Sequence, residues 1–578
     1  MTVKRTAMGY QLPLNPENSK GRIAQGFATP KQDRSPQIQS IPPKRVLPIV
    51  FIPGIMGSNL RMSSAKQDIL GAKSNIAWRP DNSSVTLAQF NDSPIERQLR
   101  LDPETTEVDS YDPQNSTTGN AAESADSRND SVTYRSGYRG WGKLEGPMLQ
   151  ADPPTVKGGR TQNQKARQRG WGEIFYGSYE NLLSICESKL NSAFYGGVMD
   201  LYLRKNIVEV EPSKWLAHPG SEMKALDEKQ MRDSVKGCWF PVHAMGYNWL
   251  RGNAESGSGI AKRISKLIDS YSSQGFQCEK VILVTHSMGG LVARAVIHPQ
   301  IGNVGQKILG IIHGVMPAMG AGAAYKRMRC GVEGSGVSGS ITADVLGDNA
   351  KDVTAVLADA QGALELLPSK SYGSHWLQVS QNGKIIKSWP EKCPYEEIYK
   401  AAGKWYSLFR EDFINPAQLD YRGFLHTVSL LEDAKIFHEQ IANTYHEQSY
   451  AHYGVDSERK AWHKVVWKID ENIDLNDIDK FSLVEDDSRG KMKLLNKTSK
   501  SALKRIKFIE VSMMDAADPG DQTVPSHSAD AQLHSKKFKG VFRQKGYEHQ
   551  ASYSDGSVLA ATMYCLFNII STMKWSEK

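Results

Sequence analysis

A serine in the stretch VILVTHSMGG could act as a nucleophile, because an apolar run leads directly into it and two glycines follow. The apolar run is typical of a buried strand, and Gly289–Ile297 is typical of a short helix that stops before Pro299. A sharp strand–turn–helix junction requires small residues two positions before and after the serine, because larger side chains would strike the strand or the helix. Thr285 and Gly289 meet this requirement. The sequence therefore predicts Ser287 as a nucleophile; the alternative is that a five-residue pattern has arisen by chance in a long chain.

The serine needs a base elsewhere in the chain, because an alcohol is almost fully protonated near neutral pH. For this type of junction the chain order is serine, then a carboxylate, then histidine, each in a loop that follows a strand. His549 follows the strand-like stretch GVFRQ and precedes an apolar closing helix, so it is the predicted base. His527 and His534 lie before that strand and are the alternatives. His286, beside the serine, is expected to point away from it and to contribute to packing.

Three candidate acids lie between the serine and the base, in the stretch DAADPGDQTVPSHSA. Asp521 is favoured, because Gly-Asp-Gln-Thr-Val-Pro combines a tight turn with the start of the next element. Asp515 and Asp518 remain alternatives, and any of the three could be an ordinary turn residue. Ser287, Asp521 and His549 together occur in the order that a catalytic triad of this type requires.

Attack by a serine produces an oxyanion, which needs two backbone N–H donors. One donor is expected from Met288, next to the nucleophile. The other is expected from the loop PGIMG, residues 53–57, where Met56 is favoured and Ile55 is the alternative. The loop could also be a plain glycine turn. No metal or organic cofactor is required by this chemistry.

Apolar segments that alternate between strand and helix patterns predict an α/β fold, with a mostly parallel sheet covered by helices on both faces. The expected strands are Val46–Pro53, Val281–Val284, Lys307–Ile312, Arg505–Met514 and Gly540–Arg543, and the expected helices are Gly259–Ser273, Gly289–Ile297 and Ser557–Met573. The predicted core is discontinuous and comprises residues 45–60, 237–320 and 503–578. Two large insertions interrupt it and are expected to form a cap or lid.

The segments outside the core differ from it in composition. Residues 1–44 carry seven Lys/Arg against two Asp/Glu and several prolines, which is typical of a disordered basic arm. Residues 61–236 form the first insertion, in which an acidic stretch, 101–130, precedes a basic stretch, 131–170, so mobile polar loops are expected there. Residues 321–502 form the second insertion, the expected cap or lid.

The second insertion and the segment before it carry residues suited to an apolar substrate. Val315–Ala324, rich in Met, Gly and Ala, could line an acyl pocket or pack as a loop at the sheet edge. Five tryptophans of the insertion could lie at a membrane boundary or form the core of the cap. These tryptophans are Trp376, Trp389, Trp405, Trp462 and Trp467.

Composition excludes several other classes of protein. The net charge of +8, from 71 Lys/Arg and 63 Asp/Glu, is compatible with anionic lipid surfaces and too weak to indicate nucleic acid. The six cysteines are scattered without a Cys-x-x-Cys pair, which argues against a disulfide framework or a cysteine zinc site. The N-terminus lacks the apolar core of a signal peptide. Ile308–Ala324 and Val558–Met573 are apolar but interrupted, so both are expected to be core elements rather than membrane spans.

IPGIMGSNL, the THSMGG junction, GDQTVP and the late EHQ together resemble lecithin:cholesterol acyltransferase-type lipases, which are α/β-hydrolases. The stretch IIHGVMPAMGAGAAYKRM also resembles bacterial lipase effectors delivered by type VI secretion. The resemblance covers about a quarter of the chain and is confined to the core. It implies Ser287, Asp521 and His549 as nucleophile, acid and base, and Met56 and Met288 as oxyanion donors. Thr285 and Gln522 depart from the commonest spellings of the motifs, without removing a group that the chemistry uses.

The resemblance implies a serine esterase that hydrolyses acyl esters of membrane phospholipids, with the properties of an antibacterial toxin delivered by type VI secretion. Such a protein is expected to be made soluble in a bacterial cytoplasm without a signal peptide, and to be exported to act at the membrane or periplasm of a target cell. The implied partners are a phospholipid membrane, a secretion-system spike or adaptor protein and a cognate immunity protein. The alternatives are an ordinary intracellular lipase or acyltransferase and, from another class, a catalytically inert binding or adaptor module on a hydrolase fold.

Overall fold

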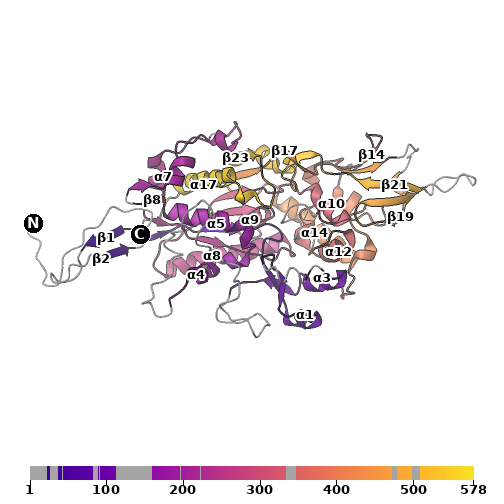
Figure 1. The fold of residues 1–578 in the computed structure, drawn as a ribbon, viewed down its shortest axis with the longest axis horizontal. Helices are drawn as coiled ribbons and strands as arrows, with labels where there is room; N and C mark the ends of the chain where they lie inside the picture. The colour runs from indigo at the N-terminus through magenta and orange to yellow at the C-terminus, as the bar shows by residue number, and fades with distance from the viewer. Residues whose placement is uncertain are drawn as a thin grey trace, which may run out of the picture.

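The structure, a computed structural model, describes residues 22–26, 37–41, 43–81, 89, 91–111, 159–195, 197–221, 223–333, 346–470, 478–496 and 508–577. An α/β core lies at the centre, with the cap at one end of the molecule (Figure 1). At the opposite end, β1 (Arg22–Gly26) and β2 (Gln37–Ile41) pair antiparallel. These two strands contradict the expectation of a disordered arm where they occur. The other residues of the arm up to residue 42 lie outside the described ranges.

The core sheet has six strands in the order β11, β4, β12, β13, β16, β23. Their bounds are Val242–Ala244 for β11, Ile49–Ile52 for β4, Val281–His286 for β12, Ile308–Gly314 for β13, Ser449–Gly454 for β16 and Phe538–Gln544 for β23. Every neighbouring pair is parallel, which confirms the predicted α/β sheet. The carboxyl ends of all six strands therefore meet at one edge, where such sheets place their functional residues.

Successive side chains of the core strands are buried on opposite faces of the sheet, as the two-residue period of a strand requires. In β4, Val50 and Ile52 enter one apolar cluster, whereas Ile49 and Phe51 enter the other. Helices cover both clusters: α8 (Asn253–Ser273) and α9 (Gly289–Ile297) the first, and α5 (Tyr176–Asn191) and α17 (Gly556–Ser571) the second. Burial on both faces explains why the strand is a continuous aliphatic run.

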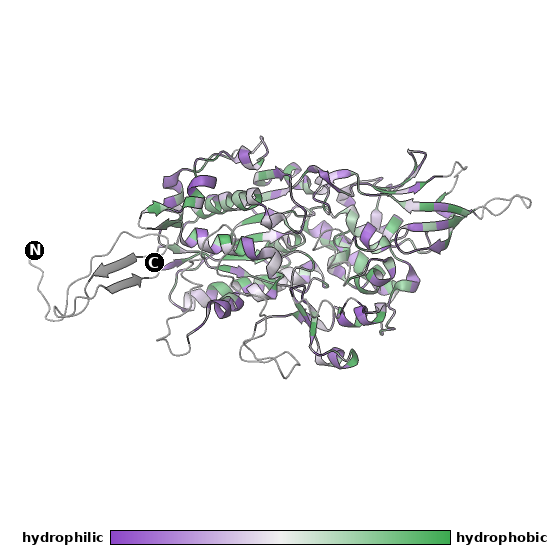
Figure 2. Cartoon of the chain, in the orientation of Figure 1, coloured by the Kyte–Doolittle hydropathy of each residue, from purple (hydrophilic) through white to green (hydrophobic). Residues whose placement is uncertain are grey.

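The two longest apolar segments are elements of this core, as expected. Ile308–Ala324 begins with β13, and Val558–Met573 contains most of α17. Figure 2 shows α17 as largely hydrophobic, in contrast to the hydrophilic peripheral helix α7 (Glu228–Val235). Within the described ranges, no helix is both long enough and apolar enough to cross a membrane.

One strand of the core sheet comes from a segment that the sequence pattern placed in the second insertion. This strand is β16, whose sequence SYAHYG lacks a continuous aliphatic run although all of its residues are buried between β13 and β23. The predicted core strand Arg505–Met514 is instead β21 (Phe508–Met513), which pairs with β18 (Val465–Ile469) and β20 (Lys491–Leu495). The predicted core is therefore wrong at these two places: β16 belongs to it and β21 does not.

Most of the second insertion, together with β21, forms a cap with its own six-stranded sheet, in the order β15, β14, β18, β21, β20, β19. The remaining bounds are Lys384–Trp389 for β15, Leu377–Gln381 for β14 and Ser482–Asp486 for β19. Helix α10 (Gly322–Cys330) contacts β18 of this sheet and also α12 (Ala350–Leu357), and the cap further contains α14 (Phe424–Ile441). All five tryptophans of the cap are at most 7% exposed within one apolar cluster. They form the core of the cap, so their placement at a membrane boundary is wrong for this structure.

The first insertion contains more regular structure than its composition indicates. The described residues between 60 and 111 include a small sheet and the helices α1 and α3: β5 (Leu60–Met62), β6 (Ile76–Trp78), β7 (Thr106–Val108), α1 (Ser64–Ile69) and α3 (Pro94–Arg100). Beyond residue 159, α4 (Gln162–Gln168), α5, α6 (Leu201–Asn206) and α7 follow. The expectation of mobile polar loops is therefore contradicted for these residues. Residues 112–158, most of the acidic-to-basic stretch, lie outside the described ranges.

Candidate active site

Ser287 occupies the turn between β12 and α9, at the carboxyl edge of the core sheet. Its φ of 51° lies in the left-handed region, which residues other than glycine rarely adopt. Its amide donates to the carbonyl oxygen of Gly314 at 2.8 Å, which secures the turn to β13. At Gly289 an added Cβ would lie 2.4 Å from the carbonyl oxygens of Ile52 and Pro53, so only glycine fits. The predicted strand–turn–helix junction is present, and close packing holds the serine on it.

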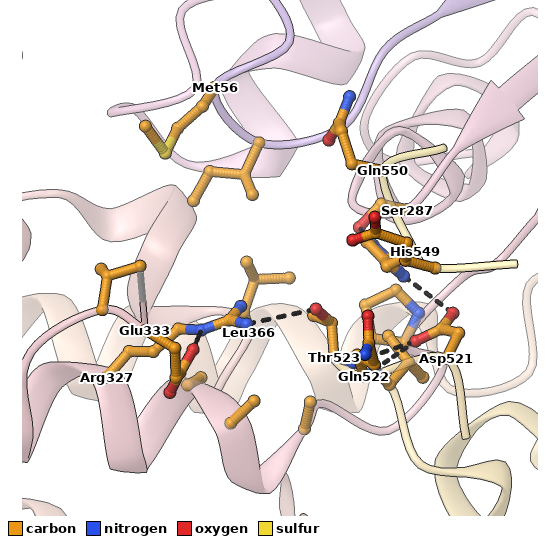
Figure 3. Close-up of a pocket in the computed structure, with 18 of the residues that line it drawn as sticks. Met56, Ser287, Arg327, Glu333, Leu366, Asp521, Gln522, Thr523, His549 and Gln550 are labelled. Atoms are coloured by element: carbon orange, nitrogen blue, oxygen red, sulfur yellow. Dashed lines mark hydrogen bonds and ion pairs between the residues drawn. The ribbon is translucent and has the colours of Figure 1, made fainter. Parts of the chain in front are cut away.

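Three side chains from separate segments meet at this turn (Figure 3). His549 Nε2 lies 2.8 Å from Ser287 Oγ, and His549 Nδ1 lies 2.8 Å from Asp521 Oδ2. Ser287, His549 and Asp521 are only 4%, 8% and 1% exposed. When Nδ1 carries a proton that Asp521 accepts, the lone pair on Nε2 faces the serine hydroxyl, which is the arrangement that removes a proton from a nucleophilic serine. The structure thus brings together the three residues that the sequence singled out.

Asp521 lies at the carboxyl end of β16, although the chain passes through the cap between them. A Cβ added to Gly454, the last residue of β16, would lie 2.8 Å from the Cβ of Asp521. The Oδ1 atom of Asp521 accepts the backbone amides of Thr523 and Val524 at 3.2 and 2.7 Å, which leaves Oδ2 for the imidazole. The backbone amide of His549 donates to the Asp521 carbonyl oxygen at 2.9 Å, so the acid and base loops are joined through their backbones as well.

The alternative acids have other surroundings. The carboxylate of Asp518 accepts the backbone amides of His463 and Lys464 at 3.2 and 3.1 Å, which ties the acid loop to the cap. Asp515 lines the same pocket as the serine, but of the three aspartates it is Asp521 that bonds to His549.

The alternative bases are also placed away from the serine. The His527 ring stacks on His463 with centroids 3.9 Å apart, and its Nε2 donates to the carbonyl oxygen of Tyr372 at 2.7 Å. His534 is the last residue of the short helix α16 (Ala531–His534). His527 is therefore held between the core and the cap, and His534 lies exposed on the surface of the core.

His286 is a fixed part of the scaffold around the triad. Its Nε2 lies 3.0 Å from the backbone carbonyl oxygen of His549, and its Nδ1 lies 3.1 Å from the hydroxyl of Tyr179 on α5. A carbonyl can only accept, so Nε2 carries the hydrogen and Nδ1 accepts from the tyrosine. Burial lowers the pKa of His286 to about 3, with a further contribution from His549, so the ring is neutral near pH 7. The expectation that His286 serves packing is extended by this role in holding the base loop.

The Tyr179 hydroxyl joins three loops of the site. Besides donating to His286, it accepts from the amide of Gly54 at 3.5 Å and from Gln550 Nε2 at 3.3 Å. Burial raises the pKa of this phenol to about 12, so it stays protonated. One buried hydroxyl therefore connects the loop after β4, the nucleophile turn and the base loop.

The loop after β4 has a conformation suited to presenting its amides. Met56 has a φ of 59°, and its carbonyl oxygen accepts from Trp78 Nε1 at 2.7 Å. The backbone amides of Ile55, Met56 and Met288 have no acceptor within the described part of the chain. They are therefore available to an oxyanion, and the assignment of Met288 with Met56, or with Ile55, stays a prediction.

A pocket of about 470 Å³ contains the serine, with contributions from the core, the first insertion and the cap. Its apolar wall includes Ile55, Met56, Trp78, Met328, Leu357 and Leu366. Four residues of the Val315–Ala324 segment also line it, namely Pro317, Ala321, Ala323 and Ala324. The segment therefore contributes to the pocket wall, and its role as an acyl pocket stays a prediction. Charged residues occupy another part of the wall and include Arg327, Glu333, Glu458 and Lys460.

A charged cluster on α10 connects the cap to the acid loop (Figure 3). The guanidinium of Arg327 pairs with Glu333 at 2.8 Å and donates through Nη2 to the hydroxyl of Thr523 at 3.2 Å. Lys326 also contacts Glu333, at 2.6 Å, and the two cations bring the pKa of this carboxylate down to about 2 in spite of its burial. Thr523 lies two residues after Asp521, so the cap helix and the triad acid share one rigid polar connection.

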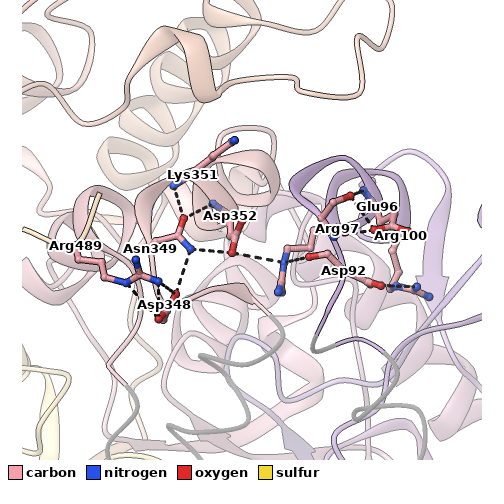
Figure 4. A network of polar contacts seen from close by, with 10 residues as sticks. Asp92, Glu96, Arg97, Arg100, Asp348, Asn349, Lys351, Asp352 and Arg489 are labelled. Carbon is pink, nitrogen blue, oxygen red and sulfur yellow. Dashed lines mark hydrogen bonds and ion pairs between the residues drawn. The ribbon is translucent and has the colours of Figure 1, made fainter. Parts of the chain in front are cut away.

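A second polar network joins the first insertion to the cap (Figure 4). Arg97 of α3 lies 4.0 Å from the carboxylate of Asp352 on α12, and Asn349 donates to the same carboxylate at 2.9 Å. Arg489, between β19 and β20, pairs with Asp348 at 2.8 Å. Both insertions therefore contribute to the cover over the site.

Sequence reasoning missed three residues that shape this site. Tyr179, Trp78 and Gln550 are identified only by their contacts with the catalytic loops. Tyr179 and Trp78 belong to the first insertion, which was expected to be polar and irregular. Gln550 is the last residue of the EHQ stretch that the sequence analysis quoted, where only His549 was given a role.

Comparison with known proteins agrees with this geometry. A family described as the PGAP1-like alpha/beta domain matches residues 256–325, which include Ser287. Among solved structures, the chain is similar to one described as "The crystal structure of Tle4-Tli4 complex", with a TM-score of 0.68 and 28% sequence identity. That match covers 92% of this chain and 99% of the other. A comparison with curated proteins finds no match.

The chain thus has an α/β-hydrolase fold, as the sequence predicted. The similarity to Tle4 extends over nearly the whole chain, so it includes both insertions as well as the core. It confirms the resemblance to type VI lipase effectors that the sequence motifs indicated.

Proposed function

We propose that the protein is a serine esterase that hydrolyses acyl esters of membrane phospholipids. The observation that carries the proposal is the continuous hydrogen-bonded chain from Ser287 through His549 to Asp521, within a pocket that has a long apolar wall. An inert binding module would not need a serine held in a strained left-handed conformation beside a buried imidazole and carboxylate.

In the proposed reaction, His549 Nε2 accepts the Ser287 proton as Oγ bonds to the ester carbonyl carbon. The carbonyl electron pair moves onto oxygen, and the resulting oxyanion accepts hydrogen bonds from the Met288 and Met56 amides. Asp521 stabilises the imidazolium through Oδ2, while its Oδ1 remains on the backbone amides of its own loop. Each oxyanion donor contributes about 3 kcal/mol to lowering the barrier.

The tetrahedral intermediate collapses when the ester oxygen leaves with the proton from His549. This step releases a lysolipid and leaves the acyl group bonded to Ser287 Oγ as an acyl-enzyme. Water then loses a proton to His549 and attacks the acyl carbon, and the second collapse returns the proton to Ser287 Oγ and releases the fatty acid. The residues that carry the reaction are thus the same in both halves.

The composition of the pocket supports a lipid ester as substrate. Side chains of the cap, such as Met328, Leu357 and Leu366, supply an apolar surface for an acyl chain. The charged part of the wall, which holds Glu333 and Glu458 as well as Arg327 and Lys460, suits the polar end of a phospholipid better than a triacylglycerol.

We further propose that the protein acts as an antibacterial toxin delivered by type VI secretion. The sequence resemblance to type VI lipase effectors and the similarity to Tle4 support this proposal. Tle4 is described in complex with Tli4, so by analogy a cognate immunity protein would bind this chain in the producing cell. A secretion-system spike or adaptor would carry it to the membrane or periplasm of a target cell.

The hydrolytic proposal is tested with pure protein and vesicles of defined phospholipids, with products identified by mass spectrometry. The expected products are fatty acid and lysolipid in equal amounts, both absent with Ser287→Ala. Added alcohol should leave the fatty acid yield unchanged, whereas an acyltransferase would divert acyl groups to a new ester. Hydrolysis that persists in Ser287→Ala would refute the assignment.

The proposed toxicity is tested separately, by expressing the chain in bacteria with and without a periplasmic signal. Growth should stop only when the protein is sent to the periplasm and only when Ser287 is present. Harmless periplasmic expression of an enzyme that cleaves phospholipids in vitro would reject the toxin role while leaving the esterase in place.

A further inference from the structure

A second cavity, of about 230 Å³, lies beside the catalytic pocket. The two cavities share one segment of the chain, because Ala318 and Met319 line the second cavity while Pro317 and Ala321 line the first. The lining of the second cavity is polar and includes the cations Arg294 and Lys537, and no carboxylate side chain is among its described lining residues. Its charge is therefore positive, unlike that of the mixed catalytic pocket.

Arg294, near the end of α9, is a buried cation without a carboxylate partner in the described part of the chain. It is only 2% exposed, and its Nε and Nη2 donate to the backbone carbonyls of Thr444 and Ile441, just beyond and at the end of α14. These carbonyls account for part of its stabilisation, and that of Ile441 belongs to the negative end of the α14 dipole. Nη1 remains buried without an acceptor among the described residues. A buried guanidinium with an unused donor favours an anion close by.

Two further side chains leave hydrogen-bonding groups for a ligand. Ser369 is 3% exposed, lines the cavity and has no side-chain partner within the described ranges. His438 lies 2.6 Å through Nε2 from the carbonyl oxygen of Glu365, so Nε2 carries the hydrogen and Nδ1 has a free lone pair. Burial lowers the pKa of His438 to about 4, so the ring is neutral near pH 7. The cavity thus offers positive charge, a hydroxyl and one acceptor.

We propose that this cavity binds a phosphate group, as inorganic phosphate or a small phosphate monoester, between Arg294, Lys537 and Ser369. The phosphate hydroxyl donates to His438 Nδ1. A fully deprotonated oxyanion has no hydrogen to donate and cannot form this bond. Lys537 is exposed and its Nζ already reaches the carbonyl oxygen of Asn443 at 2.8 Å, so it stands at the rim of the cavity. The site is separate from the triad, and the proposal is independent of the esterase function.

The proposal is tested by calorimetric titration of the full chain with inorganic phosphate, glycerol 3-phosphate and sulfate at constant ionic strength. Phosphate and glycerol 3-phosphate should bind saturably, and sulfate about tenfold more weakly because it has no proton to donate to His438. Ser369→Ala and Lys537→Gln should each weaken phosphate binding about tenfold. Lys539→Gln removes an equally exposed charge on β23 outside the cavity and should bind as the wild type does.

Vesicles that contain phosphatidic acid, mixed with Ser287→Ala so that no lipid is cleaved, distinguish the source of the phosphate. Binding to vesicles that is weakened by Ser369→Ala, without binding of the soluble phosphates, assigns the site to a lipid head group; binding of the soluble phosphates assigns it to a free ligand. The proposal is overturned if neither the soluble phosphates nor the vesicles bind. It is also overturned if Ser369→Ala and Lys537→Gln bind phosphate as the wild type does, or if Lys539→Gln weakens binding as much as Lys537→Gln does.

Discussion

Replacing Asp521 by asparagine should slow ester hydrolysis by about four orders of magnitude while preserving the fold. The structure explains why so small a change is severe. Oδ1 of Asp521 accepts two backbone amides, at 3.2 and 2.7 Å, while Oδ2 lies 2.8 Å from His549 Nδ1. An asparagine must keep its carbonyl oxygen on the two backbone donors, because an NH₂ group in that place would face other N–H groups. Its NH₂ group then faces His549.

The imidazole of the variant is consequently held in the wrong tautomer. His549 Nδ1 must accept from the asparagine, so the hydrogen moves to Nε2, which can no longer take the proton of Ser287. A loss of about 10⁴-fold corresponds to roughly 5.4 kcal/mol of barrier at 1.36 kcal/mol for each tenfold. The asparagine retains the volume of the aspartate and the bonds to Thr523 and Val524, so the fold is expected to remain intact.

Initial rates with a soluble p-nitrophenyl ester measure this effect without the complication of a lipid surface, and thermal unfolding checks the fold. Asp518→Asn is the matched control, because Asp518 bonds to backbone amides of the cap and does not touch the triad. The reasoning fails if folded Asp521→Asn retains a rate within tenfold of the wild type. It also fails if Asp515→Asn or Asp518→Asn shows the large loss instead.

Three further changes probe the scaffold. Gly289→Ala should lower the rate of ester hydrolysis at least about 100-fold, because the added Cβ would lie 2.4 Å from two backbone carbonyl oxygens and displace the serine. By contrast, Gly259→Ala, in an open part of α8, should raise the free energy of unfolding by about 1 kcal/mol. Tyr179→Phe removes the hydroxyl that joins three loops and should lower the free energy of unfolding by about 1–3 kcal/mol in denaturant titrations. Burial lowers the pKa of His313 and His452 to about 3, so below pH 6.5 the unfolded chain binds protons that the folded chain does not. Stability should therefore fall from pH 7.5 to 5.5, by about 1 kcal/mol for each of these histidines.

Each of these expectations has a contrary result. A Gly289→Ala enzyme with normal rates would mean that the junction is looser than its contacts indicate. Unchanged stability of Tyr179→Phe would remove the tyrosine from the scaffold. Equal denaturation midpoints at pH 5.5 and 7.5 would contradict the expected loss of stability.

The elements next to the nucleophile could be predicted from the sequence because their signals are local. The predicted helix Gly289–Ile297 coincides with α9, and the aliphatic run before Thr285 is β12. Gly289 marks the turn in the sequence, although the contacts that require this glycine are tertiary and come from Ile52 and Pro53. The order of serine, aspartate and histidine, together with the turn pattern around Asp521 and the strand-like stretch before His549, favoured the three residues that meet.

The strand that leads to the acid could not be found in the same way. SYAHYG carries polar side chains inside the core, and a partner for them exists only in the folded sheet, where for example His452 Nε2 meets the hydroxyl of Tyr553 at 3.2 Å. The chain then crosses the cap before it returns to Asp521, so the apolar strand nearest to the acid in sequence, β21, belongs to another sheet. The sequence therefore identified the correct aspartate, but the strand expected to lead to it, β21, was the wrong one.

The contributions of the insertions also escaped prediction, for a physical reason. Tyr179 lies on α5, whose burial depends on the core face that it covers, and Trp78 acts through one long-range bond to Met56. Neither contact leaves a periodic trace in the chain. The cap tryptophans show the converse, since their composition suited an interface but tertiary packing placed them inside.

The proposed chemistry requires that the Ser287 hydroxyl forms a covalent bond with the substrate. A fluorophosphonate probe tests this reactivity, and intact-mass and peptide mass spectrometry locate the adduct. The expected result is a single adduct on Ser287 that abolishes ester hydrolysis, with no adduct on Ser287→Ala. An adduct on another residue, or an unlabelled enzyme that still cleaves esters, would show that this serine is not the nucleophile.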